Sequence, residues 1–141
     1  MNALRALASA CLFATATTSV MAVDLDSLPN IKDLPKDYVQ VSPMIPMLGE
    51  HYDNQKLGTV PHAEAYCGYK GKIICIEYLT TPADFAAGKS FKNLHGVGGL
   101  PPVDHIDLDF EAKGHGDWKG IALYMLRVYF ISTADLAAMT P

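Results

Sequence analysis

The segment from residue 62 to residue 80, HAEAYCGYKGKIICIEYLT, constrains the fold of this chain more than any other stretch. It consists of two runs rich in β-branched and aromatic residues, separated by Lys70 and Gly71. Glycine adopts the positive φ angles that a tight turn requires, so the two runs predict an antiparallel β-hairpin. We therefore expect an antiparallel sheet that contains this hairpin.

Two further strands and two short helices are predicted from the rest of the sequence. Residues 121–132, IALYMLRVYFIS, form the continuous apolar run of a strand inside a sheet, and residues 104–110, DHIDLDF, alternate between polar and apolar. Residues 81–88, TPADFAAG, begin with a capping Thr and Pro and end with Gly, and the tail STADLAAM begins with a Ser and a Thr, either of which can cap a helix. These patterns predict an α+β fold, mainly an antiparallel β-sheet or a partly closed barrel, with short peripheral helices.

Residues 1–22 have the features of a cleaved signal peptide. Arg5 supplies a positive charge, an Ala-rich apolar stretch follows, and Val20-Met21-Ala22 suits a signal peptidase. The apolar run is shorter than the about 20 residues of a membrane span. We therefore expect a periplasmic or secreted protein without a membrane span. A lipoprotein is the alternative, because Ala8-Ser9-Ala10-Cys11 resembles a lipobox, although apolar sequence continues beyond this cysteine.

The mature chain then has 141 − 22 = 119 residues, which suits one domain. Residues 23–41 are rich in proline and predict an extended N-terminal arm with a short strand at 37–41, and residues 42–141 predict a single β-rich domain. Loss of Arg5 leaves 10 basic and 15 acidic residues, a net charge of 10 − 15 = −5. No basic run remains, which argues against nucleic acids and anionic membranes as partners.

Two cysteines, Cys67 and Cys75, remain in the mature chain on either side of the hairpin turn. Disulfides persist in the compartments that receive exported proteins. One hairpin register makes the two cysteines neighbours, whereas a shift by one residue places them on opposite faces. A disulfide and a pair of buried free thiols are therefore both compatible with the sequence.

The stretch DHIDLDF is the first candidate for a functional surface. As a strand, it is expected to bury one face, formed by Ile106, Leu108 and Phe110, and to display another, formed by His105, Asp107 and Asp109. The polar face is either part of a site or only the solvated side of a sheet.

Two other histidines and a carboxylate complete the candidate site. His51 follows a Gly-Glu pair, and His115 lies between two glycines, where an imidazole can approach a ligand closely. Glu77 lies among apolar residues and shares a face with Ile73 and Cys75 by the period of two, which favours burial. We expect His51, His105 and His115 to converge in one pocket, as ligands of a divalent metal or as a proton-sensitive cluster.

The order of MLGEHY, AYCGYKGKIICIEYL, LPPVDHIDLDF, GHGDW and YMLRVYFIS resembles an uncharacterised family of secreted bacterial proteins, the TTHB-type domain of unknown function. The resemblance covers roughly residues 42–131. It implies a small exported β-rich protein that tends to self-associate, without an assigned reaction. The family's Gly-x-His, Asp-His and Gly-His elements match Gly49-Glu50-His51, Asp104-His105 and Gly114-His115.

The last strand departs from the family pattern. Where the family has His-Tyr-Asp-x-His, this chain has Leu123-Tyr124-Met125-Leu126-Arg127, so two imidazoles and a carboxylate are replaced. A polar site that those residues complete in relatives is therefore altered here. Arg127 can pair with Asp107 or Asp109 through its planar guanidinium, which would give an ion-pair network without a metal.

Two functions follow from these patterns. The first is an exported domain that binds a small ligand or a divalent metal in a pocket formed by His51, Glu77, His105, Asp107, His115 and Arg127. The second is a non-catalytic envelope protein that acts as a homo-oligomeric structural or interaction module through a sheet edge or an apolar strand. The sequence leaves the substrate, any enzymatic activity and any cofactor beyond a possible divalent metal undetermined.

Overall fold

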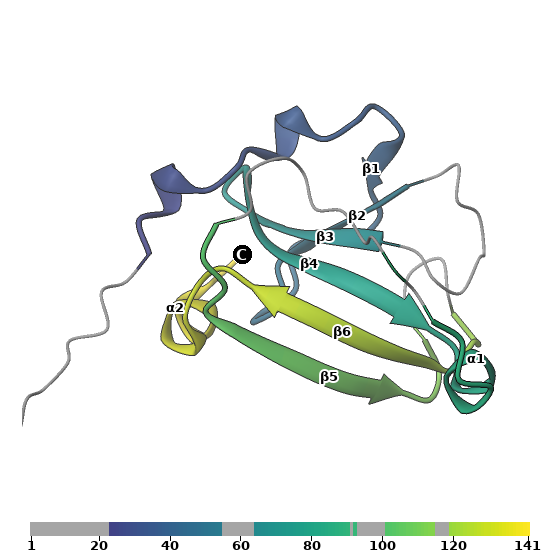
Figure 1. Cartoon of the computed structure of the whole chain (residues 1–141). Helices are drawn as coiled ribbons and strands as arrows, with labels where there is room; N and C mark the ends of the chain where they lie inside the picture. The colour runs from purple at the N-terminus through teal and green to yellow at the C-terminus, as the bar shows by residue number, and fades with distance from the viewer. Residues whose placement is uncertain (1–22, 55–63, 91, 93–100, 115–118) are drawn as a thin grey trace, which may run out of the picture.

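The computed structural model of the chain describes residues 23–54, 64–90, 92, 101–114 and 119–141. Six strands form one antiparallel sheet in the order β1-β2-β3-β4-β6-β5 (Figure 1). The strands are β1 (Tyr38–Gln40), β2 (Glu50–Asn54), β3 (Glu64–Tyr69), β4 (Lys72–Thr80), β5 (His105–Glu111) and β6 (Leu123–Tyr129). Two short helices, α1 (Pro82–Ala86) and α2 (Thr133–Ala138), lie at opposite ends of the sheet.

The sheet is open, with β1 at one edge and β5 at the other. The prediction of a mainly antiparallel sheet with short helices is therefore confirmed, whereas a partly closed barrel is not formed by the described strands. The strands predicted at 37–41, 104–110 and 121–132 are present, and so are both predicted helices with their Thr81 and Ser132 caps.

The predicted hairpin is formed by β3 and β4. Lys70 and Gly71 have φ angles of 50° and 76°, as a two-residue type I′ turn requires. Beyond the turn a β-bulge shifts the register, so that Gly68 lies opposite Ile73 while Cys67 lies opposite Cys75. The expectation that Ile73 shares a face with Cys75 and Glu77 is therefore wrong, because the bulge adds one residue between them.

The same bulge brings Cys67 and Cys75 directly opposite each other, and a disulfide joins them with a Cα–Cα distance of 4.9 Å. A two-residue turn without the bulge would place Cys67 opposite Ile74 instead. The irregularity in β4 is therefore what selects the register in which the two sulfurs meet.

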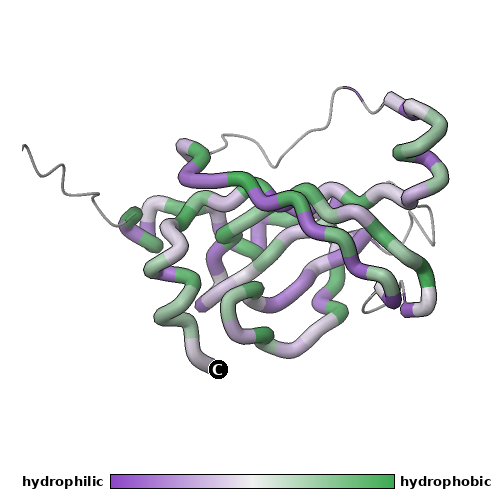
Figure 2. The backbone as a smooth tube through the Cα atoms, turned by 90° about the horizontal axis from the view of Figure 1, so that it is seen from below, coloured by the Kyte–Doolittle hydropathy of each residue, from purple (hydrophilic) through white to green (hydrophobic). Residues whose placement is uncertain are grey.

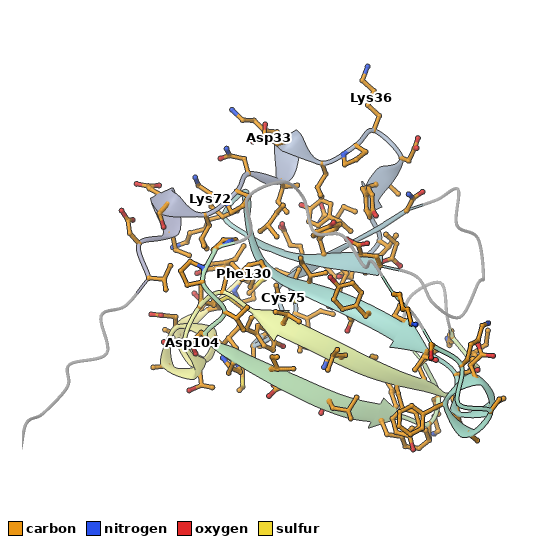
Figure 3. All side chains as sticks on the ribbon, viewed as in Figure 1. Asp33, Lys36, Lys72, Cys75, Asp104 and Phe130 are labelled. Atoms are coloured by element: carbon orange, nitrogen blue, oxygen red, sulfur yellow. A yellow bond between two sulfur atoms is a disulfide. The ribbon has the colours of Figure 1, made fainter. Side chains whose placement is uncertain are left out.

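The N-terminal arm packs along the turn end of the hairpin. It contains two 3₁₀ turns, η1 (Leu25–Ser27) and η2 (Ile31–Asp33). The backbone N–H of Ile73 donates to Pro29 (2.8 Å), and the Lys72 ammonium, labelled in Figure 3, donates to the Asp26 carbonyl (3.1 Å). Leu28 is 3% exposed, so the arm contributes to the core.

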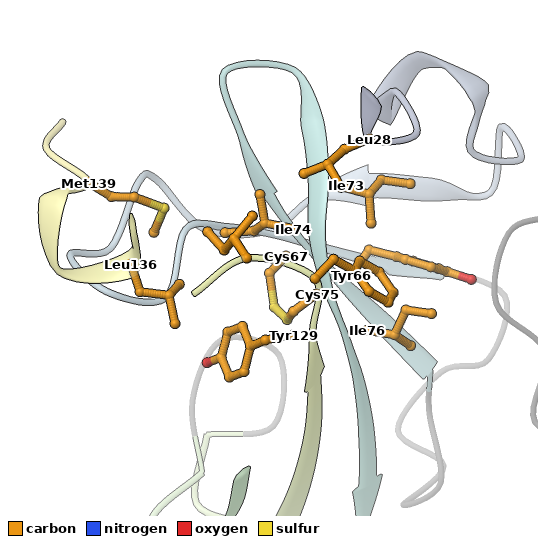
Figure 4. Close-up of a cluster of buried hydrophobic side chains, with 12 residues drawn as sticks. Leu28, Tyr66, Cys67, Ile73, Ile74, Cys75, Ile76, Tyr129, Leu136 and Met139 are labelled. Carbon is orange, nitrogen blue, oxygen red and sulfur yellow. A yellow bond between two sulfur atoms is a disulfide. The ribbon is translucent and has the colours of Figure 1, made fainter. Parts of the chain in front are cut away.

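The core lies on both sides of the hairpin (Figure 4). On one side Leu136 and Met139, from α2 and the residues after it, lie near the disulfide and Tyr129. On the other side Leu28 of the arm lies near Ile73. A second buried cluster, formed by Leu79, Leu123 and Met125, lies at the other end of β4 and β6. Strand β5 forms the edge of the sheet next to β6 (Figure 1).

Candidate functional site

Most of the predicted site residues lie on one face of the sheet, in two cross-strand rows. Residues that lie directly opposite each other in paired strands point to the same face. The first row is His51, Cys67, Cys75, Tyr129 and His105, and the second is Asp53, Ala65, Glu77, Arg127 and Asp107. We call this side of the sheet the polar face.

Arg127 is the centre of the second row. Its Nε donates to Oε1 of Glu77 (2.7 Å), and its Nη1 donates to Oδ2 of Asp109 (2.6 Å). Its Nη2 donates to the sulfur of Met125 at 3.3 Å. The side chains of Arg127 and Glu77 are 6% and 1% exposed, whereas that of Asp109 is 51% exposed. The predicted pairing of Arg127 with Asp109 is therefore present, and Glu77 is buried as expected.

The electrostatics of this cluster favour a charged guanidinium. Burial alone would lower the pKa of Arg127, but the nearby Glu77, Tyr129 and Asp109 outweigh burial, and the pKa is raised. Burial raises the pKa of Tyr129 to about 12; Arg127 opposes this shift, and Asp107 and Glu77 add to it. Arg127 thus stays charged and Tyr129 neutral at physiological pH.

His51, the second residue of β2, is buried, with 2% exposure. The Ser42 hydroxyl accepts a hydrogen bond from the backbone N–H of His51 (2.9 Å) and lies 3.1 Å from its Nδ1. The nearby Gly49 has a φ of 84°, and a Cβ there would lie 2.5 Å from the Gly68 carbonyl oxygen. His51 is therefore held by packing and by Ser42, a partner that sequence reasoning missed because a Ser after a strand has no distinctive signal.

His105 begins β5, at the opposite edge of the sheet. Its Nδ1 lies 2.9 Å from Oδ1 of Asp104, and its ring stacks on Tyr129 with a centroid distance of 4.6 Å and an interplanar angle of 15°. Tyr129 lies opposite His105 and two residues from Arg127 along β6, so it connects His105 to the row of Arg127. Sequence reasoning also missed Tyr129.

The structure does not bring His51 and His105 together, so the predicted convergence of the histidines is wrong for this pair. They belong to the same row, but β3, β4 and β6 lie between their strands. Four inter-strand spacings of about 4.8 Å separate them by about 19 Å. His115 lies outside the described residues.

A metal site is not formed by the described residues. No group of three or more His, Cys, Asp or Glu side chains in this part of the chain is placed to hold a metal ion. Arg127 occupies the centre of the carboxylates and engages Glu77 and Asp109 directly. Its positive charge would also repel a cation. The described residues therefore do not fit a divalent metal.

The apolar face of β5 differs most from expectation. Ile106, Leu108 and Phe110 were expected to be buried, but they are 58%, 60% and 54% exposed. The reason is position, because β5 is an edge strand, whereas the N-terminal arm and α2 pack on the hairpin. Figure 2, in which β5 lies nearest the viewer, shows the alternation of hydrophobic and hydrophilic residues along this strand.

One cavity lies away from all of these residues. It has a volume of about 270 Å³ and lies between the N-terminal arm, the hairpin turn and α2, lined by residues that include Val23, Tyr69 and Met139. None of the predicted site residues lines it. In the described part of the chain, no helix has the length and apolar character that a membrane crossing requires.

Comparison with known proteins provides a fold relationship only. No family model and no curated protein matches the sequence. Among solved structures, the chain is similar to a hypothetical protein, TTHB210, from Thermus thermophilus, with a TM-score of 0.56 and 14% sequence identity. The alignment covers 70% of this chain and 85% of that chain. The chain therefore shares its fold with an uncharacterised domain, and membership of a secreted family stays a prediction.

Proposed function

We propose that this chain is a non-catalytic, exported interaction module that self-associates through an apolar surface on β5 and β6. The observation that supports this function best is the exposure of Ile106, Leu108 and Phe110, each more than half exposed, beside Leu126 at 36%. Single exposed apolar residues are ordinary, but a contiguous group of them indicates a contact surface.

The surface is continuous and uncharged across three strands. Leu108 lies opposite Leu126, which lies opposite Tyr78, and Phe110 lies opposite Tyr124. The rings of Phe85 in α1 and of Phe110 each lie 5.0 Å from that of Tyr124, so the surface extends onto the helix. We call the residues Phe85, Ile106, Leu108, Phe110, Tyr124 and Leu126 the outer apolar face.

A second copy of the chain is the partner that this chemistry fits best. An uncharged apolar face is complementary to itself, as an isologous two-fold interface requires. Two outer apolar faces packed together would bury the large side chains that are exposed in the single chain. A small-ligand pocket has less support, because Arg127 is paired with Glu77 and Asp109, and His51 and His105 lie several strands apart.

Light scattering after size-exclusion chromatography tests this function. We expect the natural chain to be a dimer or larger, and Leu108→Lys to be a monomer, because a lysine cannot be buried between two apolar faces. Val39→Lys is the matched control, since Val39 is 41% exposed on the opposite edge strand. A monomeric natural chain, or equal effects of the two folded variants, would contradict the proposal.

The proposed location is the periplasm or the exterior, with a mature chain that begins at Val23. The sequence Val20-Met21-Ala22 supports this start, and a disulfide suits an oxidising compartment. The intact mass of the exported form should equal that of residues 23–141. A mass that includes a diacylglycerol on Cys11 would show a lipoprotein instead.

A further inference from the structure

The outer edge of β5 has an unusual main-chain surface. The strand is seven residues long, contains no proline and keeps a constant register with β6. In the described part of the chain no strand pairs with its other side, and the opposite edge strand, β1, has only three residues. Figure 1 shows β5 at the lower edge of the sheet. Such an edge presents unpaired N–H and C=O groups that a further strand can bind.

The two faces of β5 differ in chemistry, and both are exposed. Asp107 and Asp109 lie on the polar face, and the apolar residues of β5 lie on the other. With Glu77 and Arg127, the two aspartates form a cluster of formal charge 1 − 3 = −2. Because side chains of an added strand also alternate between faces, basic residues would meet the aspartates while apolar residues continue the outer apolar face.

The edge does not suit a second copy of itself. When two copies of β5 pair antiparallel about a two-fold axis, residues that lie opposite each other point to the same face of the sheet. Their residue numbers are therefore both odd or both even, and the sum of the two numbers is even. A sum of 214 places Asp107 opposite Asp107, a sum of 216 places it opposite Asp109, and a sum of 218 places Asp109 opposite itself. Each register that overlaps by five or more strand residues thus opposes two carboxylates, which is destabilising.

We infer that the outer edge of β5 binds an extended segment of another protein in which basic and apolar residues alternate, by addition of that segment as a seventh strand of the sheet. Main-chain hydrogen bonds would supply affinity, and the alternating side chains would supply specificity. Arg127 acts as a positioning residue, because its 2.6 Å bond fixes the side chain of Asp109 on the polar face. This inference shares β5 with the proposed self-association but depends on the strand edge and the aspartates.

Three peptides of seven residues, measured by fluorescence anisotropy with the full chain, test the inference. The first alternates lysine and valine, the second alternates glutamate and valine, and the third is the first with alternate backbone nitrogens methylated. We expect the second and third to bind about tenfold or more weakly than the first, because one lacks the positive charges and the other lacks main-chain donors. Bound lysine–valine peptide should also slow hydrogen exchange of β5 amides.

Two variants distinguish binding of the peptide at the edge of β5 from non-specific attraction between the peptide and the negative charges of the chain. Asp107→Asn should weaken binding of the lysine–valine peptide about threefold. Asp26→Asn, an equal loss of charge at an exposed site in η1, should leave binding unchanged. Equal binding of the methylated or the acidic peptide, or no binding at all, would overturn the inference. The oligomeric state is measured in the same samples, so a dimer that fails to bind the peptide contradicts the strand addition alone.

Discussion

Replacement of Arg127 by methionine should be among the most destabilising single substitutions in the described chain. The guanidinium donates to Glu77 and Asp109 at 2.7 and 2.6 Å, and the Arg127 and Glu77 side chains are 6% and 1% exposed. Arg127→Met removes this cation and leaves the charge of Glu77 in a buried site. Removal of one partner of a buried ion pair typically costs about 3–5 kcal/mol of the free energy of unfolding.

The double variant separates a buried charge from lost packing. When both partners are replaced by apolar residues of similar volume, the loss is often abolished. The free energy of unfolding of the double variant Glu77→Leu with Arg127→Met should therefore lie within about 1 kcal/mol of that of the natural chain, although each single variant is strongly destabilised. Asp109 tolerates the double change because its side chain is 51% exposed and stays hydrated.

Urea unfolding followed by circular dichroism measures these differences, since urea is uncharged and does not screen ion pairs. Lys89→Met is the control, because Lys89 pairs with Asp84 at 3.4 Å with its side chain 46% exposed, and it should cost less than about 1 kcal/mol. A loss below about 1 kcal/mol for Arg127→Met, or additive losses in the double variant, would refute the reasoning.

Three further predictions follow from the described geometry. Alkylation of the denatured, unreduced protein should modify neither Cys67 nor Cys75, and replacement of both by serine should cost about 2–3 kcal/mol, as expected for a short closed loop. The free energy of unfolding should fall as the pH rises from about 10 towards 12. Burial raises the pKa of Tyr129 to about 12, so the folded chain keeps this proton after the unfolded chain has lost it. The absorbance of tyrosinate and the circular dichroism signal should change in the same pH range. Gly49→Ala should cost more than about 1 kcal/mol in urea unfolding, because Gly49 has a φ of 84° and a Cβ would approach the Gly68 carbonyl.

Local patterns in the sequence were sufficient for most secondary structure. The tight turn at Lys70-Gly71 and the N-caps of both helices depend on residues within a few positions of each other, and these predictions are confirmed. Strand β2 was missed because EHYDN has no apolar alternation and no Val or Ile. Its pairing with β1 and β3 compensates for the weak local preference.

The candidate site was harder to predict because it depends on strand order. Arg127 meets Glu77 only because β6 inserts between β4 and β5, which places residues 50 positions apart opposite each other. The same strand order puts β2 and β5 near opposite edges, which separates His51 from His105. Neither the bulge that aligns the cysteines nor this order can be read from the spacing of residues along one strand.

The alternation in β5 identifies two faces but does not tell which one the fold covers. In an interior strand the apolar face is normally the buried one, and that rule led to the expectation for Ile106, Leu108 and Phe110. At the edge, Leu108 is 60% exposed and the Asp109 side chain 51%, so neither face is favoured by burial. Arg127 on the neighbouring strand pairs with Asp109, whereas the apolar residues of β5 each stay more than half exposed. The hydrophobic effect then favours a partner over the apolar residues, while the aspartates along the same edge select against a second β5 and for a basic strand.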